Sequence, residues 1–187
     1  MRTLYVYDYK NYKVDGTVGV RPSVRAIIIK DGKLGMIHSR KFDYYTFAGG
    51  GIDPGESQEE ALIREVREEL GLKVRPETIR EYGLLIRKEK GAIDDLFIQE
   101  NYYYLCEVEE QQLEQELEGY EIVEDYELCW VTPETAIRTN WDHDHGEMGG
   151  GPGHEDHMHH LFHRDEMLIR KLVEEGLIPT GESAENG

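Results

Sequence analysis

The sequence predicts a mixed α/β fold, in which a mixed β-sheet is flanked by helices. Short β-branched and aromatic runs are interspersed with helical patterns, without a strict βαβ alternation. One segment carries a clear helix-capping signal, and an Asp-Gly pair marks a hairpin. A chain of 187 residues can form one domain with a substantial core, but is short for two. We therefore expect one domain over residues 1–178 and a polar tail over 179–187.

The strands are predicted from alternation and from β-branched content. Aromatic residues alternate at Tyr5, Tyr7 and Tyr9, which indicates an edge strand that can pair with a second copy in a homodimer. Further strands are predicted at residues 24–29, 34–37, 44–47, 79–87, 97–108 and 126–131. Asp31-Gly32 lies between the first two of these and predicts that they form a hairpin.

The helices are predicted from capping residues and apolar spacing. Ser57 to Leu70 begins with Ser57 as N-cap and Glu60 at the third helical position, and Gly71 suits the C-terminal cap. A short helix should follow Thr132-Pro133, and apolar spacing predicts a C-terminal helix over 158–176. The acidic segment 109–125 is expected to hold a short helix and a loop, and the Gly/His-rich segment 140–157 a long loop.

The charge balance narrows the range of partners. A net charge of -18 disfavours nucleic-acid binding, because phosphate contacts need clustered Lys and Arg. An acidic protein that handles a polyanionic substrate needs a cation to offset the repulsion. Two cysteines, no signal-peptide pattern and no long apolar stretch lead us to expect a cytoplasmic protein without membrane association.

A cluster of carboxylates falls on the predicted helix at 57–70. Glu65, Glu68 and Glu69 are spaced i, i+3 and i+4, so they share one helix face. The neighbouring apolar stripe would let the helix dock on a core and present the carboxylates at its rim. Carboxylate oxygens are the ligands that Mg²⁺ prefers, although a Glu-rich helix face is more often simply solvated.

This segment, residues 50–72, resembles the Nudix box. The pattern requires a Gly, a Glu six residues later, an Arg-Glu pair, a Glu-Glu pair and a final Gly with an aliphatic residue. The matching residues are Gly50, Glu56, Arg64, Glu65, Val66, Glu68, Glu69, Gly71 and Leu72. Seven of these positions are fixed to one residue type, so a chance match is on the order of 10⁻⁸ per starting position.

The resemblance implies an α/β/α sandwich and a Mg²⁺-dependent hydrolase, with Mn²⁺ as an alternative cation, that cuts a phosphoanhydride bond of a nucleoside-diphosphate-linked small molecule. It implies that Glu65, Glu68 and Glu69 are metal ligands and that the Gly49 carbonyl can join them. Glu68 is favoured as the base that removes a proton from the attacking water.

Residues around the box receive further roles from the resemblance. Glu56 and Arg64 correspond to a structural pair in which Arg64 orients the glutamates. A further carboxylate outside the box often contributes, and Glu118 and Glu121 are the candidates here.

The substrate is much less constrained. Family members specific for ADP-ribose carry a proline about sixteen residues after the box, where this chain has Lys88. By elimination, a nucleoside triphosphate, including an oxidised one, is the expected substrate. Isolated cationic and aromatic residues offer candidate contacts to it: Arg25, Arg40, Lys41 and Tyr45.

Histidines are concentrated near the C-terminus. Seven of the eight fall between residues 143 and 163: His143, His145, His154, His157, His159, His160 and His163. His159 and His163 have the i, i+4 spacing that can chelate Zn²⁺ or Ni²⁺. A mobile polar insertion without a fixed ligand set is favoured over a second metal site, and a lid over the substrate is a third interpretation.

Two alternative functions stay open on the same scaffold. A Nudix-like isomerase of isoprenoid diphosphates would need a catalytic cysteine, but Cys106 and Cys129 both lie in predicted strands and are interpreted as core residues. A non-catalytic ligand sensor is the other alternative, since a fold does not determine a function. The intact set of Glu65, Glu68 and Glu69 argues against it.

Overall fold

The computed structural model describes residues 1–142, 145 and 154–181, with the side chains of 154–159 left out of the description. The chain forms two compact units that alternate along the sequence. Unit 1 comprises residues 1–27, 49–67 and 72–113, and unit 2 comprises residues 28–48, 68–71 and 114–187. Each unit contains a four-stranded sheet. The predicted α/β class with a mixed sheet and helices is confirmed, but the strands are divided between two sheets.

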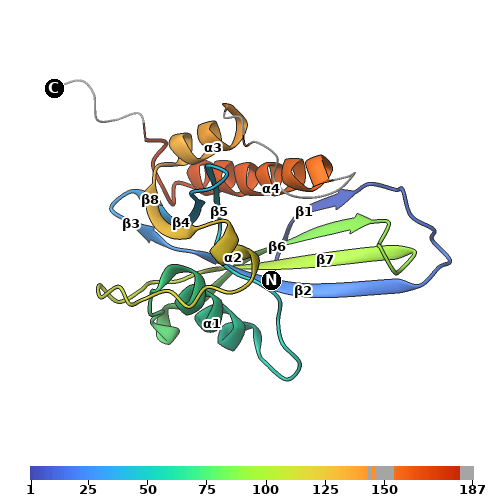
Figure 1. Ribbon diagram of the computed structural model, residues 1–187, viewed down its shortest axis with the longest axis horizontal. Helices are drawn as coiled ribbons and strands as arrows, with labels where there is room; N and C mark the ends of the chain where they lie inside the picture. The colour runs from blue at the N-terminus through green and yellow to red at the C-terminus, as the bar shows by residue number, and fades with distance from the viewer. Residues whose placement is uncertain (143–144, 146–153, 182–187) are drawn as a thin grey trace. The chain divides into compact units, whose positions relative to one another are not determined.

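The sheet of unit 1 is mixed. Its strands are β1 (Thr3–Asp8), β2 (Val18–Ile27), β6 (Arg80–Glu89) and β7 (Leu96–Leu105). They lie side by side in the order β1-β6-β7-β2 (Figure 1). β6 and β7 are antiparallel, whereas β1 and β2 run parallel to their neighbours. β1 is an edge strand, as predicted.

Strand β2 is longer than the sequence predicted. It begins at Val18 rather than residue 24, and it pairs with β7 without a break from Val18–Leu96 to Ile27–Leu105. Pro22 is tolerated in this extension because β2 lies at the sheet edge, where one side of the strand needs no hydrogen-bond donor. Pairing with β7 thus outweighs the low strand propensity of Gly19 and Pro22 in this extension.

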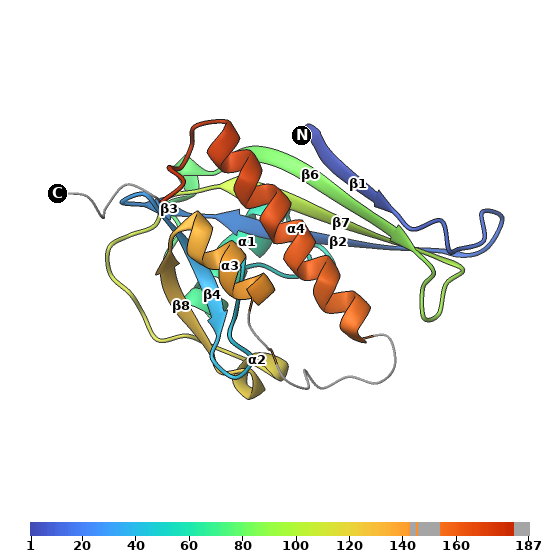
Figure 2. The ribbon, with the colours of Figure 1, turned by 90° about the horizontal axis from the view of Figure 1, so that it is seen from above.

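The sheet of unit 2 is antiparallel and centred on β4. Its strands are β3 (Ile29–Lys30), β4 (Lys33–Ser39), β5 (Tyr44–Thr46) and β8 (Tyr126–Val131). β4 lies beside β8, as Figure 2 shows from above. The predicted hairpin turn is present, with φ of 50° at Asp31 and 71° at Gly32, as a type I′ turn requires. Its first arm is only the two-residue β3, because the predicted strand 24–29 is interrupted at Ile28.

Helix α1 (Gln58–Leu70) begins with the predicted capping box. The Ser57 hydroxyl accepts a hydrogen bond from the Glu60 amide at 3.2 Å, and the Glu60 carboxylate accepts one from the Ser57 amide at 2.9 Å. Gly71 ends the helix with φ of 64°. Leu62, Val66 and Leu70 form a fully buried stripe, so the helix presents a polar side away from the core.

The remaining helices are α2 (Tyr120–Val123), α3 (Pro133–Asp142), α4 (His154–Glu174) and a 3-10 turn at Pro76–Thr78. Helices α3 and α4 pack together. The prediction of a loop over residues 140–157 is wrong at both ends, because α3 continues to Asp142 and α4 begins at His154. The Glu, Asp and His residues at the start of α4 are compatible with a helix. Its central part, 143–144 and 146–153, lies outside the described residues. No helix among the described residues has both the length and the apolar character needed to span a bilayer.

A buried polar cluster joins α4 to β5 within unit 2. Asp165 is fully buried, and its carboxylate accepts hydrogen bonds from Thr46 Oγ1 at 2.7 Å and from Arg164 Nε at 2.7 Å. Arg164 Nη2 also donates to Asp165 Oδ2 and to Thr46 Oγ1, each at 3.1 Å. The carboxylate is thus paired with a cation and a hydroxyl at once, which is the condition under which a buried charge is tolerated.

Candidate active site

The glycine loop before α1 is held against strand β2. The Val24 amide donates to the Gly50 carbonyl at 2.9 Å, and the Ile52 amide donates to the Pro22 carbonyl at 3.3 Å. Gly49 has φ of 140°, and a Cβ there would lie 2.0 Å from the Val24 carbonyl oxygen. Only glycine fits at this position, so the close approach of the two backbones is fixed by the sequence.

The carbonyl of Gly49, predicted to join the metal ligands, accepts a hydrogen bond from Nη1 of Arg25. Arg25 lies on β2 and is half-buried. A carbonyl oxygen has two lone pairs and can accept from more than one partner. The structure therefore places Arg25, a predicted substrate contact, directly at the glycine loop.

Arg64 connects the loop to the carboxylates of the helix. Its guanidinium binds both oxygens of Glu56, with Nε–Oε1 at 2.8 Å and Nη2–Oε2 at 2.9 Å. Nη1 donates to Glu65 Oε1 at 2.8 Å, and Nη2 donates to the Gly51 carbonyl at 3.1 Å. The hydrogen bonds from Arg64 lower the pKa of Glu56. A planar guanidinium with five donors is suited to such a junction, and lysine could not replace it.

The three glutamates of α1 differ in exposure. Glu65 is 8% exposed and Glu69 is 3% exposed, whereas Glu68 is half-exposed. Gly50 leaves room for Glu65, because a Cβ at that glycine would lie 2.3 Å from Glu65 Oε1. The side chain most accessible to a solvent molecule on this helix face is therefore that of Glu68.

The C-terminal turn of α1 is joined to the acidic segment 114–121 within unit 2. The Glu116 amide donates to the Glu68 carbonyl at 2.9 Å, and the Gln115 side-chain amide donates to the Glu69 carbonyl. These hydrogen bonds were not predicted, because the only sequence feature of the stretch that contains Gln115 and Glu116 is a bias towards acidic residues. They hold the segment that carries Glu121 next to the end of the helix.

Of the two predicted extra carboxylates, Glu121 lies near Glu68. Burial raises the pKa of Glu121, and the negative charges of Glu68 and Glu118 raise it further. Glu121 Oε2 accepts a hydrogen bond from the Glu118 amide at 2.9 Å, while the Glu118 side chain itself is exposed. A neighbouring like charge of this kind favours the protonated form or a bound cation.

The carboxylates of α1 and of Glu121 are the donor type that a hard divalent cation prefers. Glu65, Glu68 and Glu69 lie on one face of α1, and Glu121 adds a fourth carboxylate close to Glu68. All of these donors are oxygens, which suit Mg²⁺ or Mn²⁺ rather than a thiol-seeking metal. The charge of Glu68 raises the pKa of Glu121, and a bound cation would relieve this repulsion.

The other predicted substrate contacts lie in unit 2. Arg40 forms an exposed ion pair with Asp125 at 3.4 Å, and the Lys41 amine lies 4.9 Å from the ring centroid of Phe42. Tyr45 stacks on His38, with ring centroids 4.6 Å apart. These residues therefore gather around the β4–β5 turn, and their roles in binding remain predictions.

The described histidines of the C-terminal cluster contact protein groups. The ring nitrogens of His145 lie 2.7 Å from the Phe42 carbonyl oxygen and 3.0 Å from that of Asn140, and His163 packs edge-on against Trp141. Burial and nearby His163 lower the pKa of His160. His143 and the side chains of His154, His157 and His159 lie outside the described residues, so the predicted pair at 159 and 163 is not tested.

The cysteines differ from each other. Cys106 is buried, as expected for a core residue, and burial raises its pKa to about 12. Cys129 is only half-buried, so its interpretation as a core residue is wrong. Its thiol points towards Glu127 on the same strand, and burial followed by the charge of Glu127 raises its pKa. Neither thiol is thus activated as a nucleophile, which disfavours the isomerase alternative.

Comparisons with known proteins agree with the motif. The NUDIX domain family model matches residues 19–149. The chain is 44% identical over 122 residues to CTP pyrophosphohydrolase of Escherichia coli, a match that covers 62% of this chain and 78% of that protein. It is 45% identical over 60 residues to RNA pyrophosphohydrolase of Teredinibacter turnerae, covering 30% of this chain and 34% of that protein.

A solved structure supports the fold. The NUDIX hydrolase from Nitrosomonas europaea aligns with a TM-score of 0.53, covering 90% of this chain and 98% of that one. At 14% identity this likeness shows the fold alone. The family model, the pyrophosphohydrolase relatives and the complete box at residues 50–72 together identify an enzyme that acts on pyrophosphate bonds. The chain belongs to the Nudix hydrolase family.

Proposed function

We propose that the protein is a Mg²⁺-dependent nucleoside triphosphate pyrophosphohydrolase, which converts a nucleoside triphosphate and water into a nucleoside monophosphate and pyrophosphate. The observation that carries the proposal is the contact of Arg64 with both Glu56 and Glu65, which pre-orients the carboxylate face of α1. The CTP pyrophosphohydrolase relative supports a triphosphate, with CTP as the first substrate to test. The strongly acidic charge argues against a long RNA, although an RNA pyrophosphohydrolase also matches over a short stretch.

Glu65, Glu68 and Glu69 would hold the cations, with Glu121 as a further carboxylate near Glu68. Bound divalent cations supply charge neutralisation for the phosphate oxygens and lower the pKa of a water molecule. Glu68 is the proposed base, because it is the half-exposed glutamate of this face. Arg64 acts as a positioning residue through Glu65, and the half-buried Arg25 at the glycine loop offers a cation for the triphosphate.

Substrate turnover with matched variants tests the proposal. Wild-type protein is assayed with Mg²⁺ for release of pyrophosphate or phosphate from nucleoside triphosphates, an oxidised guanosine triphosphate, nucleotide sugars, ADP-ribose and dinucleoside polyphosphates. Glu68→Gln should lower kcat by about 10²- to 10⁴-fold, as expected for loss of a general base. Glu59→Gln is the control, since it makes the same change on an exposed position of the same helix.

The outcomes separate the alternatives. Pyrophosphate release from a triphosphate that Glu68→Gln loses and Glu59→Gln retains would support the proposal. Turnover of ADP-ribose or of a dinucleoside polyphosphate instead would keep the hydrolase and overturn the substrate class. Absence of turnover across the panel, combined with binding of a nucleotide, would favour the non-catalytic sensor.

A further inference from the structure

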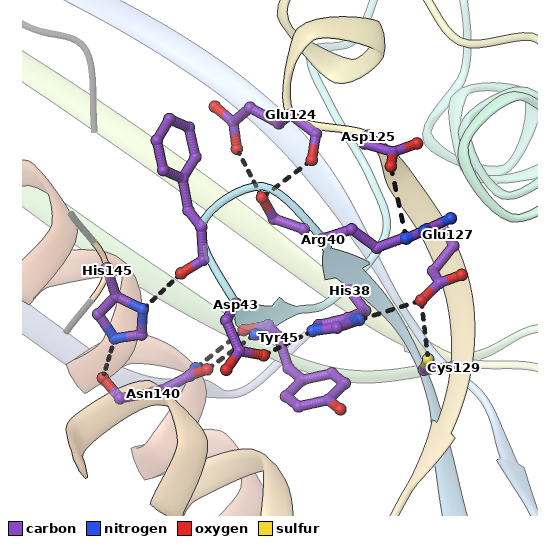
Figure 3. Close-up of polar contacts among 12 residues, drawn as sticks. His38, Arg40, Asp43, Tyr45, Glu124, Asp125, Glu127, Cys129, Asn140 and His145 are labelled. Atoms are coloured by element: carbon purple, nitrogen blue, oxygen red, sulfur yellow. Dashed lines mark hydrogen bonds and ion pairs between the residues drawn. The ribbon is translucent and has the colours of Figure 1, made fainter. Parts of the chain in front are cut away.

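Strands β4 and β8 bring three chemically different metal-ligating side chains together in unit 2 (Figure 3). His38 on β4 lies directly opposite Glu127 on β8 in the antiparallel register. Cys129 follows Glu127 by two residues, so its side chain lies on the same face of the sheet. One nitrogen, one oxygen and one sulfur atom of these residues lie within 4.8 Å of one another, and this is the one such group among the described residues.

The separations are close to those between ligands of a tetrahedral metal. His38 Nδ1 lies 3.1 Å from Glu127 Oε1, and Cys129 Sγ lies 3.9 Å from the same oxygen. Zinc bonds of about 2.0–2.3 Å to nitrogen, oxygen and sulfur place tetrahedral neighbours roughly 3.3–3.7 Å apart. The observed distances lie on either side of this range, so an ion requires shifts of a few tenths of an ångström.

The imidazole is already oriented from its other side. His38 Nε2 lies 2.8 Å from Asp43 Oδ1, which is the carboxylate–histidine contact that fixes ring orientation and proton position in metal sites. Asp43 has φ of 53°, so the β4–β5 turn holds it in a left-handed conformation from which its carboxylate reaches the ring. Tyr45 stacks on the ring with an interplanar angle of 20°, which restricts its rotation.

We propose that His38 Nδ1, a carboxylate oxygen of Glu127 and Cys129 Sγ bind one Zn²⁺ ion, with Asp43 as the hydrogen-bond partner of His38. A thiolate and an imidazole select zinc over Mg²⁺, so this site differs in metal from the all-oxygen set of α1. The His38 side chain is 17% exposed and that of Glu127 is 41% exposed, which leaves a path for the ion. Three protein ligands leave a fourth position for water, and the ion would cross-link β4 to β8 independently of the hydrolytic site.

Cobalt substitution tests this site directly, because Co²⁺ bound by a thiolate gives a charge-transfer absorption in the near ultraviolet that histidine or carboxylate sites do not give. Untagged full-length protein is titrated with Co²⁺ and then with Zn²⁺, with metal content measured after dialysis. We expect one ion per chain with the thiolate absorption. Cys129→Ser should abolish the absorption and weaken binding at least tenfold. Cys106→Ser should leave both unchanged, since Cys106 is buried and belongs to unit 1, whereas the proposed ligands belong to unit 2.

Two further variants separate the site from other binding. Asp43→Asn should keep the absorption but weaken zinc binding by about 10- to 100-fold, the effect expected for losing the partner of a ligating histidine. Glu127→Gln should weaken binding without removing the thiol. A thiolate absorption that survives Cys129→Ser, or stoichiometric binding that never shows this absorption, would overturn the proposal and place the ion elsewhere, as in the C-terminal histidine segment.

Discussion

Replacing Asp165 by alanine is expected to destabilise the protein more than any exposed charge substitution. The change removes a carboxylate that is fully buried and leaves the buried Arg164 guanidinium and the Thr46 hydroxyl without it. Breaking a buried ion pair in this way typically costs about 3–5 kcal/mol, because the remaining charge loses a partner in a low-dielectric environment. For a chain of this length each kcal/mol lowers Tm by about 2–4 °C, so the expected drop is about 6–20 °C.

Thermal melts followed by circular dichroism, together with urea unfolding, measure this loss. The control is Arg170→Ala, which removes an exposed i, i+4 ion pair to Glu166 on the same helix. That pair should contribute about 0.3–0.5 kcal/mol, so the control Tm should stay close to that of the wild type.

A triple variant tests the physical reason. Changing Thr46→Val, Arg164→Met and Asp165→Leu together replaces the buried cluster by apolar side chains of similar size. Such replacements are often neutral or stabilising, so the triple variant should recover much of the stability that Asp165→Ala loses. An exposed ion pair contributes at most about 1 kcal/mol. If Asp165→Ala lowers the free energy of unfolding by no more than this, the reasoning is refuted. A triple variant as unstable as the single one would refute it as well.

Three further predictions concern the glycine loop and helix α1. Arg64→Lys should lower Mg²⁺ affinity and kcat by about 10- to 100-fold, with a smaller change in KM. A lysine cannot keep both the bidentate contact with Glu56 and the contact with Glu65. Titrating Mg²⁺ while measuring turnover gives the Mg²⁺ affinity and kcat. Glu56 has a lowered pKa through its Arg64 contact, so its stabilising contribution is present above the unfolded pKa of about 4.3 and is lost as pH falls through the folded pKa. The stability difference between wild type and Glu56→Gln in urea should therefore shrink below about pH 4, and a difference that stays constant from pH 7 to pH 3 would contradict it. Gly49→Ala should cost about 1–3 kcal/mol and reduce turnover, since its Cβ would overlap the Val24 carbonyl at a positive φ; a Tm equal to that of the wild type would show that the loop can move away.

Local signals in the sequence predicted the elements that depend on neighbouring residues. The capping box of Ser57 and Glu60 and the type I′ turn at Asp31-Gly32 are formed by residues within a few positions of each other, and both are present. The extension of β2 to Val18 was missed because it depends on pairing with β7, nearly eighty residues away in the sequence. Propensity alone carries no information about such a partner.

The same distinction applies to polar side chains. The box residues could be identified from the sequence because their spacing along one helix determines which side chains share a face. Arg64 does contact Glu56 and Glu65. The pairing of Asp165 with Thr46 joins residues 119 positions apart, and the meeting of His38 with Glu127 joins residues 89 positions apart. No local sequence pattern around any of these four residues indicates its partner. The packing of α4 brings Asp165 to Thr46, and the strand register brings His38 to Glu127.

The contact between Arg64 and Glu65 also explains how the carboxylate of Glu65, a proposed metal ligand, can be buried at 8% exposure. An unpaired buried carboxylate would be protonated or would destabilise the helix. Arg64 supplies a counter-charge at one carboxylate oxygen of Glu65, Oε1. Since Arg64 is also held by both oxygens of Glu56, it need not move when a cation arrives. The pair therefore stabilises the fold and orients the proposed metal ligand Glu65, so loss of Arg64 should reduce both stability and metal affinity.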